Sequence, residues 1–183
     1  MIALRPAALA DLYTIIEGAK DHDADFLAQW AGRGFQAPLT LRQLMAQYPK
    51  GINSAESGTN IYMIHKGDPA GECIGTIQFI RIFAEEKTGY IGRFLIKDEA
   101  LRGQGYGKRA LRDMLRIGFE EFGLEEIRLN VFDINRRAIR CYESVGFVRG
   151  EISENVRVDA QGTAWNNIEM AVTKNRWIER LNP

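Results

Sequence analysis

The chain has 183 residues, a length typical of one domain, and 45% of them are hydrophobic, which suffices for a buried core. Its 24 Lys and Arg residues balance 24 Asp and Glu residues, so no overall charge attracts nucleic acid or an anionic membrane. No apolar run reaches the length of a membrane span, and no export signal is visible, so we expect no membrane partner.

The predicted elements begin with a short strand over residues 2–5 and a helix from Pro6, where apolar residues recur at helical spacing. Residues 21–58 mix acids, glycines and aromatics, and we expect one further helix and an irregular, exposed stretch there. Alternating patterns then predict three successive antiparallel strands in NIYMIHKG, ECIGTIQFIRIF and TGYIGRFLIK, which turn-like clusters separate.

The second half continues with a helical pattern over residues 105–122 and a strand in EIRLNVF. Asn135 or Asp133 can cap the next helix, which is expected to end at Gly146 before two closing strands in FVRGEISENV and NNIEMAV. This order predicts an α/β (α+β) fold, with a mixed, mostly antiparallel sheet of about seven strands flanked by helices. We expect residues 1–183 to form a single domain.

A glycine-rich segment lies between the third of the consecutive strands and the helix over 105–122. It contains Arg102, Gly103, Gln104, Gly105, Tyr106, Gly107 and Lys108. The first turn of a helix carries unpaired N–H groups and a partial positive charge, and glycines let a phosphate approach them closely. Arg102, Lys108 and Arg109 can add direct charge, so the segment predicts a phosphate site.

Spacing excludes two common phosphate loops. The dinucleotide pattern GxGxxG fails at Lys108, and the P-loop pattern fails because Arg102 and Arg109 stand where Gly and Ser or Thr are required. The segment instead fits [QR]xxGx[GA], and in this it resembles the pyrophosphate-binding motif of the GNAT superfamily of N-acetyltransferases.

A second segment, LNVFDINRRAIRCYESVGFVRGE, supports the same resemblance. The superfamily pattern of Asn, Ala, Tyr-Glu and Gly-Phe is matched by Asn135, Ala138, Tyr142, Glu143, Gly146 and Phe147. Asn135 and Tyr142, seven residues apart, project from one face of a helix and could line one groove. The resemblance covers about residues 60–175 well and 1–20 in outline, whereas 21–58 match no pattern that we can name.

The resemblance implies an acetyl-CoA-dependent N-acetyltransferase in which a primary amine attacks the thioester directly. It is most similar to the branch with ribosomal-protein, spermidine and some aminoglycoside acetyltransferases. The coenzyme-binding core would occupy about residues 60–175, and the acceptor site would lie within 21–58. Backbone groups of Phe94, Leu95 and Ile96 would pair with the pantetheine arm as another strand would.

The resemblance further implies that the amides of residues 103–108 hold the pyrophosphate and that Asn135 lines the coenzyme groove. Tyr142 would be the acid that protonates the thiolate leaving group, and the alternative is that its ring only packs the helix onto the sheet. The amine must attack as a neutral base, although at a pKa of about 10.4 only about one in a few thousand is neutral at pH 7. Some members carry a glutamate in the fourth strand, but TGYIGRFLIK contains no carboxylate.

The general base therefore remains open, and Asp98, Glu99 and Asp133 are candidates that would act through water. Acids and aromatic residues gather in the region expected to bind the acceptor, and such a cluster would suit a cationic amine. The alternative is that the acids form an exposed helix start and that the aromatic residues belong to the core. These residues are Asp21, Asp23, Asp25, Trp30 and Phe35.

Three readings of the activity stay open at this point: a general amine acetyltransferase, an aminoglycoside- or polyamine-modifying enzyme, and a non-catalytic acyl-CoA sensor of the same fold. Preference for a longer acyl chain is also open. No metal is expected, because His22 and His65 are isolated. Cys73 and Cys141 lack CxxC spacing, which favours reduced thiols and a cytoplasmic location. We expect a monomer or homodimer that binds no nucleic acid.

Overall fold

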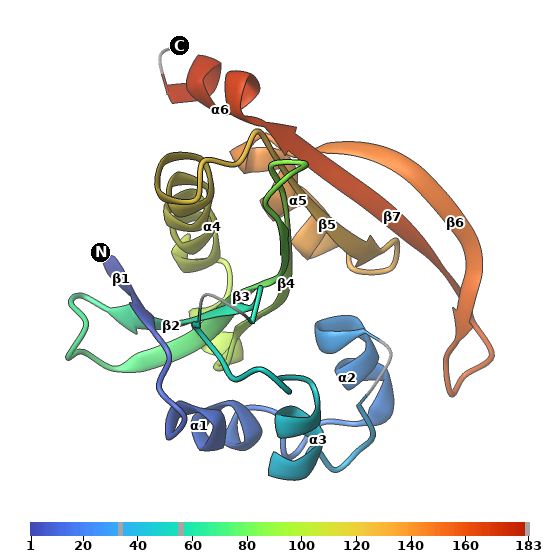
Figure 1. The fold of residues 1–183 in the computed structure, drawn as a ribbon. Helices are drawn as coiled ribbons and strands as arrows, with labels where there is room; N and C mark the ends of the chain where they lie inside the picture. The colour runs from blue at the N-terminus through green and yellow to red at the C-terminus, as the bar shows by residue number, and fades with distance from the viewer. Residues whose placement is uncertain (33–34, 55–56, 182–183) are drawn as a thin grey trace.

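The structure is a computed structural model that describes residues 1–32, 35–54 and 57–181 (Figure 1). The first half contains β1 (Ile2–Pro6), α1 (Asp11–Glu17), α2 (Ala24–Ala31), α3 (Leu41–Ala46), β2 (Asn60–Lys66), β3 (Cys73–Phe83) and β4 (Thr88–Ile96). The second half contains η1 (Glu99–Leu101), α4 (Tyr106–Arg116), η2 (Ile117–Glu121), β5 (Glu126–Phe132), α5 (Arg136–Val145), β6 (Val148–Val158), β7 (Ala164–Thr173) and α6 (Lys174–Leu181).

One sheet organises the chain, with its strands in the order β1-β2-β3-β4-β5-β7-β6. Every neighbouring pair is antiparallel except β4 and β5, which run parallel. The sequence-based prediction of a mixed, mostly antiparallel sheet of about seven strands flanked by helices is therefore confirmed. Among the helices of the described residues, none combines the length and the hydropathy that crossing a membrane requires.

Helices cover both faces of the sheet, and β2 shows this by its alternating side chains. Ile61 and Met63 belong to a core cluster with α1, α2 and α3, whereas Tyr62 and Ile64 belong to a second cluster with α4 and α5. In Figure 1, α1, α2 and α3 lie together below the central strands and α4 lies above them, while residues of α4 and α5 share one core cluster. The chain thus has two layers of helices with the sheet between them.

Several expected element bounds differ from the structure. The described part of residues 21–58 holds two helices where one was expected, and the stretch expected to be irregular and exposed includes α2, whose Leu27 and Trp30 are buried. The helix expected over 105–122 is α4 followed by the π-helical turn η2. The final helix α6 was not predicted.

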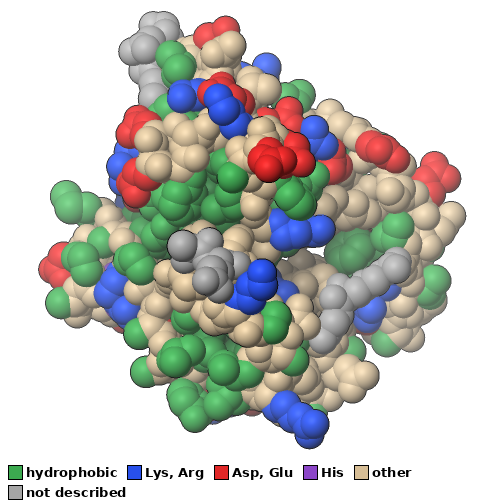
Figure 2. Space-filling model, in the orientation of Figure 1, with side chains coloured by type: hydrophobic (Ala, Val, Ile, Leu, Met, Phe, Trp, Pro, Cys, Tyr) green, Lys and Arg blue, Asp and Glu red, His purple; other side chains and the backbone are tan. Residues whose placement is uncertain are grey.

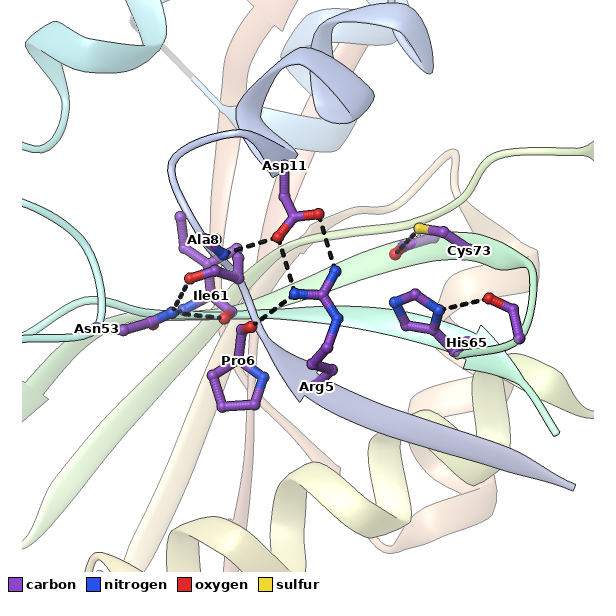
Figure 3. Close-up of polar contacts among 11 residues, drawn as sticks. Arg5, Pro6, Ala8, Asp11, Asn53, Ile61, His65 and Cys73 are labelled. Carbon is purple, nitrogen blue, oxygen red and sulfur yellow. Dashed lines mark hydrogen bonds and ion pairs between the residues drawn. The ribbon is translucent and has the colours of Figure 1, made fainter. Parts of the chain in front are cut away.

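The N-terminal strand is tied to α1 by an ion pair that Figure 3 shows in detail. The Nη2 atom of Arg5 lies 2.8 Å from Oδ1 of Asp11, and the other carboxylate oxygen accepts a hydrogen bond of 2.7 Å from the amide of Ala8. The hydrogen bond from Arg5 is the main cause that lowers the pKa of Asp11. Asn53 joins the same region to β2, since its Nδ2 donates to the carbonyl oxygens of Ala7 and Ile61 over 2.8 and 3.2 Å.

Candidate active site

Strands β4 and β5 separate in the middle of the sheet. Their parallel register runs from Thr88–Glu126 to Ile91–Leu129 and then stops, although β4 continues to Ile96. The edge of β4 that faces β5 therefore has no strand partner beyond this point within the described residues. Phe94, Leu95 and Ile96, the residues expected to pair with the pantetheine arm, all lie in this unpaired part.

A bulge in β4 accompanies the separation. Gln78 of β3 pairs with Gly92 and Thr76 pairs with Leu95, so Arg93 and Phe94 together oppose one residue. Arg93 has a φ of +48°, in the left-handed region that residues with a side chain rarely adopt. Bulges redirect side chains and end strand pairing, and here the bulge lies beside the separated strands.

The loop after β4 is held by the side chain of Arg102. Its Nε donates to the carbonyl oxygen of Ile96 over 3.0 Å, and its Nη2 donates to that of Lys97 over 3.4 Å. Its Nη1 lies 2.8 Å from the carboxylate of Glu99. The guanidinium expected to add direct charge to the phosphate site is thus engaged in fixing the loop to the strand.

The loop then presents a row of backbone donors. Gly103 and Gly105 have φ angles of +85° and +84°, and Gly105 occupies the N-cap position of α4. The amides of residues 103–108 donate no hydrogen bond to any described residue, and the first return bond of the helix runs from Arg109 to Gly105. An added Cβ at Gly105 would meet nothing within 4 Å, so the space beside this residue is open. Such a row suits an anion.

Three of the predicted segments meet at the first turn of α4. A Cβ built on Gly107 would lie 3.3 Å from Cζ of Phe94 in β4 and 3.7 Å from Sγ of Cys141 in α5. A larger residue at position 107 would therefore push α4 away from both elements. This close packing brings the loop, the free edge of β4 and α5 into one site.

Positive charge surrounds the loop from α4 and α5. The Nη2 atom of Arg137 lies 3.0 Å from the position of a Cβ built on Gly103. Burial raises the pKa of the Cys141 thiol, and the nearby charges of Lys108 and Arg137 oppose this rise. Sequence reasoning did not single out Arg137, and its only signal was the pair of arginines after Asn135 in the second motif.

A cavity of about 560 Å³ continues the basic surface from Lys108 toward α6. It is lined by Lys108, Arg112, Ser144, Val145, Arg176, Trp177, Glu179 and Arg180. Arg176 donates from Nε to the carbonyl oxygen of Gly146 over 2.9 Å, which anchors α6 against the end of α5.

Tyr142 lies on α5 with its ring packed edge-on to that of Phe147, at a centroid distance of 6.0 Å and an interplanar angle of 63°. Its hydroxyl makes no hydrogen bond to a described residue. Burial raises the pKa of Tyr142 well above its usual value, so the hydroxyl stays protonated at neutral pH and can donate a proton. Asn135 caps the same helix, because its Oδ1 accepts from the amide of Ala138 over 3.2 Å.

The carboxylates considered as a base have structural partners. Asp98 accepts from the amide of Ala100 over 2.8 Å, Glu99 pairs with Arg102, and Asp133 accepts from the amide of Asn166 over 3.1 Å. None of the three is thus a free carboxylate. Among the described residues, no three His, Cys, Asp or Glu side chains are grouped so that they could hold a metal ion.

Two of the acids in the expected acceptor region are also engaged. Asp23 caps α2 by accepting from the amide of Phe26 over 2.8 Å. Asp25 lies 2.6 Å from Nη2 of Arg157 in β6, and this hydrogen bond is the main cause that lowers its pKa. The contact ties α2 to the long β6–β7 hairpin that projects at the right of Figure 1. An opening lies near the centre of the same face, and Lys or Arg side chains border it (Figure 2).

Comparison with known proteins agrees with the geometry. Residues 22–147 match the Acetyltransferase (GNAT) family, so the match includes much of the segment for which the sequence alone suggested no pattern. An aminoglycoside N(6')-acetyltransferase type 1 from Klebsiella pneumoniae is 28% identical over 142 residues, which cover 70% of this chain and 71% of that protein.

Solved structures share the fold over nearly the whole chain. Spermidine N-acetyltransferase from Vibrio cholerae, in complex with CoA and spermine, superposes with a TM-score of 0.78 at 19% identity and covers 97% of this chain and 98% of its own. A dodecameric structure of the same enzyme gives a TM-score of 0.77 at 18% identity, with coverage of 98% and 97%. From the family match over more than half of its length, the chain belongs to the GNAT family and is an N-acetyltransferase.

Proposed function

We propose that this chain transfers the acetyl group of acetyl-CoA to a primary amine in the cleft where β4 and β5 separate. The observation that carries the proposal is the row of unpaired amides at residues 103–108, which has open space at Gly105 and lies near the free edge of β4. A thioester coenzyme with a pyrophosphate and an extended amide-bearing arm has the chemistry that these two features complement.

The amides would hold the pyrophosphate, and the charges of Lys108 and Arg137 would neutralise it. The residues that supply these amides are Gly103, Gln104, Gly105, Tyr106, Gly107 and Lys108. Arg102 would act as a positioning residue, because its side chain fixes the loop to Ile96.

The pantetheine arm would lie along β4, where its two amides would bond the backbone of Phe94, Leu95 and Ile96. The side-chain amide of Asn135, whose Nδ2 is not used in capping α5, would line the same groove.

In the reaction, the neutral amine nitrogen would attack the thioester carbon and form a tetrahedral intermediate. The C–S bond would then break, and the sulfur would take a proton from the hydroxyl of Tyr142. The amine would release its extra proton to water, since Asp98, Glu99 and Asp133 are engaged elsewhere. Tyr142 would recover its proton from solvent as free CoA leaves.

The acceptor would enter from the side of the sheet that residues 21–58 cover, and the coenzyme would occupy the core over about 60–175. Because the relatives are themselves acetyltransferases, a domain that only senses acyl-CoA is not favoured. The cytoplasmic location, the absence of a metal, the single domain and the monomer or homodimer all stay predictions.

Release of CoA tests the proposal. A thiol reagent would follow free CoA with acetyl-CoA and a panel of amino acids, N-terminal peptides, polyamines and aminoglycosides, and mass spectrometry would identify the acetylated amine. We expect turnover with at least one class of primary amine. Tight binding of acetyl-CoA without acetylation of any amine would contradict the proposal.

A further inference from the structure

Arg93 stands at the bulge of β4, one residue after the strand loses contact with β5. Its neighbour Phe94 packs toward Gly107 of α4, whereas the Arg93 side chain reaches Gln47 and Tyr48 at the end of α3. The two residues therefore serve opposite faces of the sheet. Phe94 belongs to the coenzyme side and Arg93 to the acceptor side.

A chain of hydrogen bonds holds Arg93 in place. Its Nη1 donates to the hydroxyl oxygen of Tyr48 over 3.0 Å, and that hydroxyl donates to Oε1 of Gln78 over 3.1 Å. Its Nη2 donates to Oε1 of Gln47 over 3.0 Å. The guanidinium also lies over two aromatic rings, 5.0 Å from the centroid of Phe35 and 5.6 Å from that of Tyr48. Four contacts with neutral groups thus fix the direction of one positive charge, and Gln78 in turn holds the Tyr48 hydroxyl.

The network has donors left over and no acceptor for them. Gln78 is 0% exposed, and its Nε2 atom has no hydrogen-bond partner. The Nε atom of Arg93 is buried and also unpartnered, and Gln78 is in register with Gly92, the residue before Arg93. No carboxylate of a described residue forms an ion pair with Arg93. An uncompensated charge is costly, and an anionic group on the acceptor would relieve that cost at the partly exposed guanidinium of Arg93.

Two of the three acids that were expected to bind a cationic acceptor are engaged. Asp25 is neutralised by Arg157, and Asp23 is occupied as the cap of α2. The strand that borders the acceptor side, β4, carries Arg93 and no carboxylate. A polyamine or aminoglycoside would therefore find Asp21 exposed among these three acids, together with the positive charge of Arg93.

We propose that Arg93 selects acceptor amines that carry a carboxylate, such as amino acids, and places their amino group beside the thioester. A guanidinium presents planar N–H donors that match a carboxylate, and the bulge sets this group where β4 leaves β5. The inference rests on the proposed function, since it names the acceptor class of the same site.

Matched substrate pairs test the inference. Initial rates of CoA release would be measured with amino acids and with their carboxamides, which keep the amine and lose the charge, and with spermidine as a polycation. We expect kcat/KM for the carboxylate member to exceed that for the carboxamide by about tenfold or more, as expected for a hydrogen-bonded charge pair. In Arg93→Gln this ratio falls toward one, mainly through a higher KM for the carboxylate substrate.

Two further variants separate the role of Arg93 from general effects. Arg42→Gln removes an exposed positive charge from α3, outside the network, and should keep the ratio of wild type. Tyr48→Phe keeps the charge and removes one support, so it should lower the ratio only in part. A preference that survives in Arg93→Gln, or a wild type that favours spermidine over the amino acids, would overturn the inference.

Calorimetry on the complex with CoA keeps this test apart from that of the proposed function. If amino acids bind to wild type about tenfold or more tightly than to Arg93→Gln but are not acetylated, this result would contradict only the proposed function. Acetylation of amines with equal binding to both proteins would contradict only the role of Arg93.

Discussion

The Nε–H of Arg102 donates a hydrogen bond of 3.0 Å to the carbonyl oxygen of Ile96, the last residue of β4. The side chain thereby ties the start of the amide-bearing loop to the end of the strand that it follows. Because the loop faces the pyrophosphate and β4 faces the pantetheine arm in the proposed function, this bond sets the distance between the two halves of the coenzyme site.

Arg102→Lys should raise the KM for acetyl-CoA by about tenfold, since a lysine keeps the charge but cannot reach Ile96, Lys97 and Glu99 together. The kcat should change by less than about threefold, because no reacting atom is touched. Steady-state kinetics would measure both values. Arg116→Lys, at the far end of α4, serves as the control. An equal KM for acetyl-CoA in the two variants would contradict the role of Arg102 in fixing the loop to β4.

Gly105→Ala and Gly123→Ala form a matched pair. Their φ angles are +84° and +66°, and an added Cβ meets nothing within 4 Å at either position. Each alanine should therefore lower the free energy of unfolding by about 1 kcal/mol through backbone strain alone. Only Gly105→Ala should also weaken the binding of acetyl-CoA, because it disturbs the amides at the start of α4. If calorimetry shows equal losses of affinity for acetyl-CoA in the two variants, the loop at residues 103–108 does not bind the pyrophosphate.

Tyr142→Phe should lower kcat by about 100-fold and leave the KM for acetyl-CoA unchanged, since it removes the proton donor for the thiolate. The raised pKa of Tyr142 keeps its hydroxyl protonated, so wild-type kcat/KM should rise with pH as the acceptor amine loses its proton, without a fall up to about pH 9. Tyr13→Phe, in the exposed part of α1, is the control. Unchanged turnover of Tyr142→Phe would remove the residue from the mechanism.

Asp11→Asn should reduce the free energy of unfolding by about 1 kcal/mol at pH 7, because it breaks the ion pair with Arg5. The folded-state pKa of Asp11 is lowered, so its stabilisation is present above the unfolded-state pKa of about 3.9 and is lost as the pH falls further. Denaturant unfolding of wild type and variant should therefore converge in acid. Asp21→Asn, which changes an exposed carboxylate in the loop before α2, should show no such difference. A gap between wild type and Asp11→Asn that does not narrow as the pH falls below about 3.9 would contradict this account.

Much of the fold could be predicted because its signals are local. The alternation of apolar and polar side chains predicts the strands. The N-cap residue and the C-terminal glycine predict α5, and the structure contains both. Asn135 accepts from the amide of Ala138, and Gly146 has a φ of +117°. These features depend on neighbours in sequence, so a single chain reveals them.

The missed helices depend on distant contacts. α2 has eight residues, and it is held by burial of Leu27 and Trp30 in the core cluster of α1–α3. α6 follows β7 directly and is anchored by Trp177, whose ring centroid lies 5.2 Å from that of Phe119. Helices this short gain most of their stability from tertiary packing, which a sequence pattern does not show.

The sequence motif of the candidate site could be predicted, but the contacts among its side chains could not. The glycine-rich loop and Tyr142 stand out in the sequence, but the use of Arg102 within the loop depends on where β4 ends. The approach of Arg137 to Gly103 depends on the packing of α5 beside α4. The place of Arg93 requires the register of β3 on β4, because one residue of slippage would reverse its face.

Calorimetry with acetyl-CoA and with S-acetylpantetheine, which keeps the thioester arm and lacks the pyrophosphate, tests the central claim most directly. We expect acetyl-CoA to bind about 100-fold more tightly than S-acetylpantetheine, because the latter lacks the pyrophosphate and its several charge-assisted hydrogen bonds. This difference in affinity should narrow in Gly105→Ala, where the amides that donate these bonds are disturbed. Equal affinity of the two compounds, or a gap that Gly105→Ala leaves unchanged, would contradict a pyrophosphate site at the start of α4.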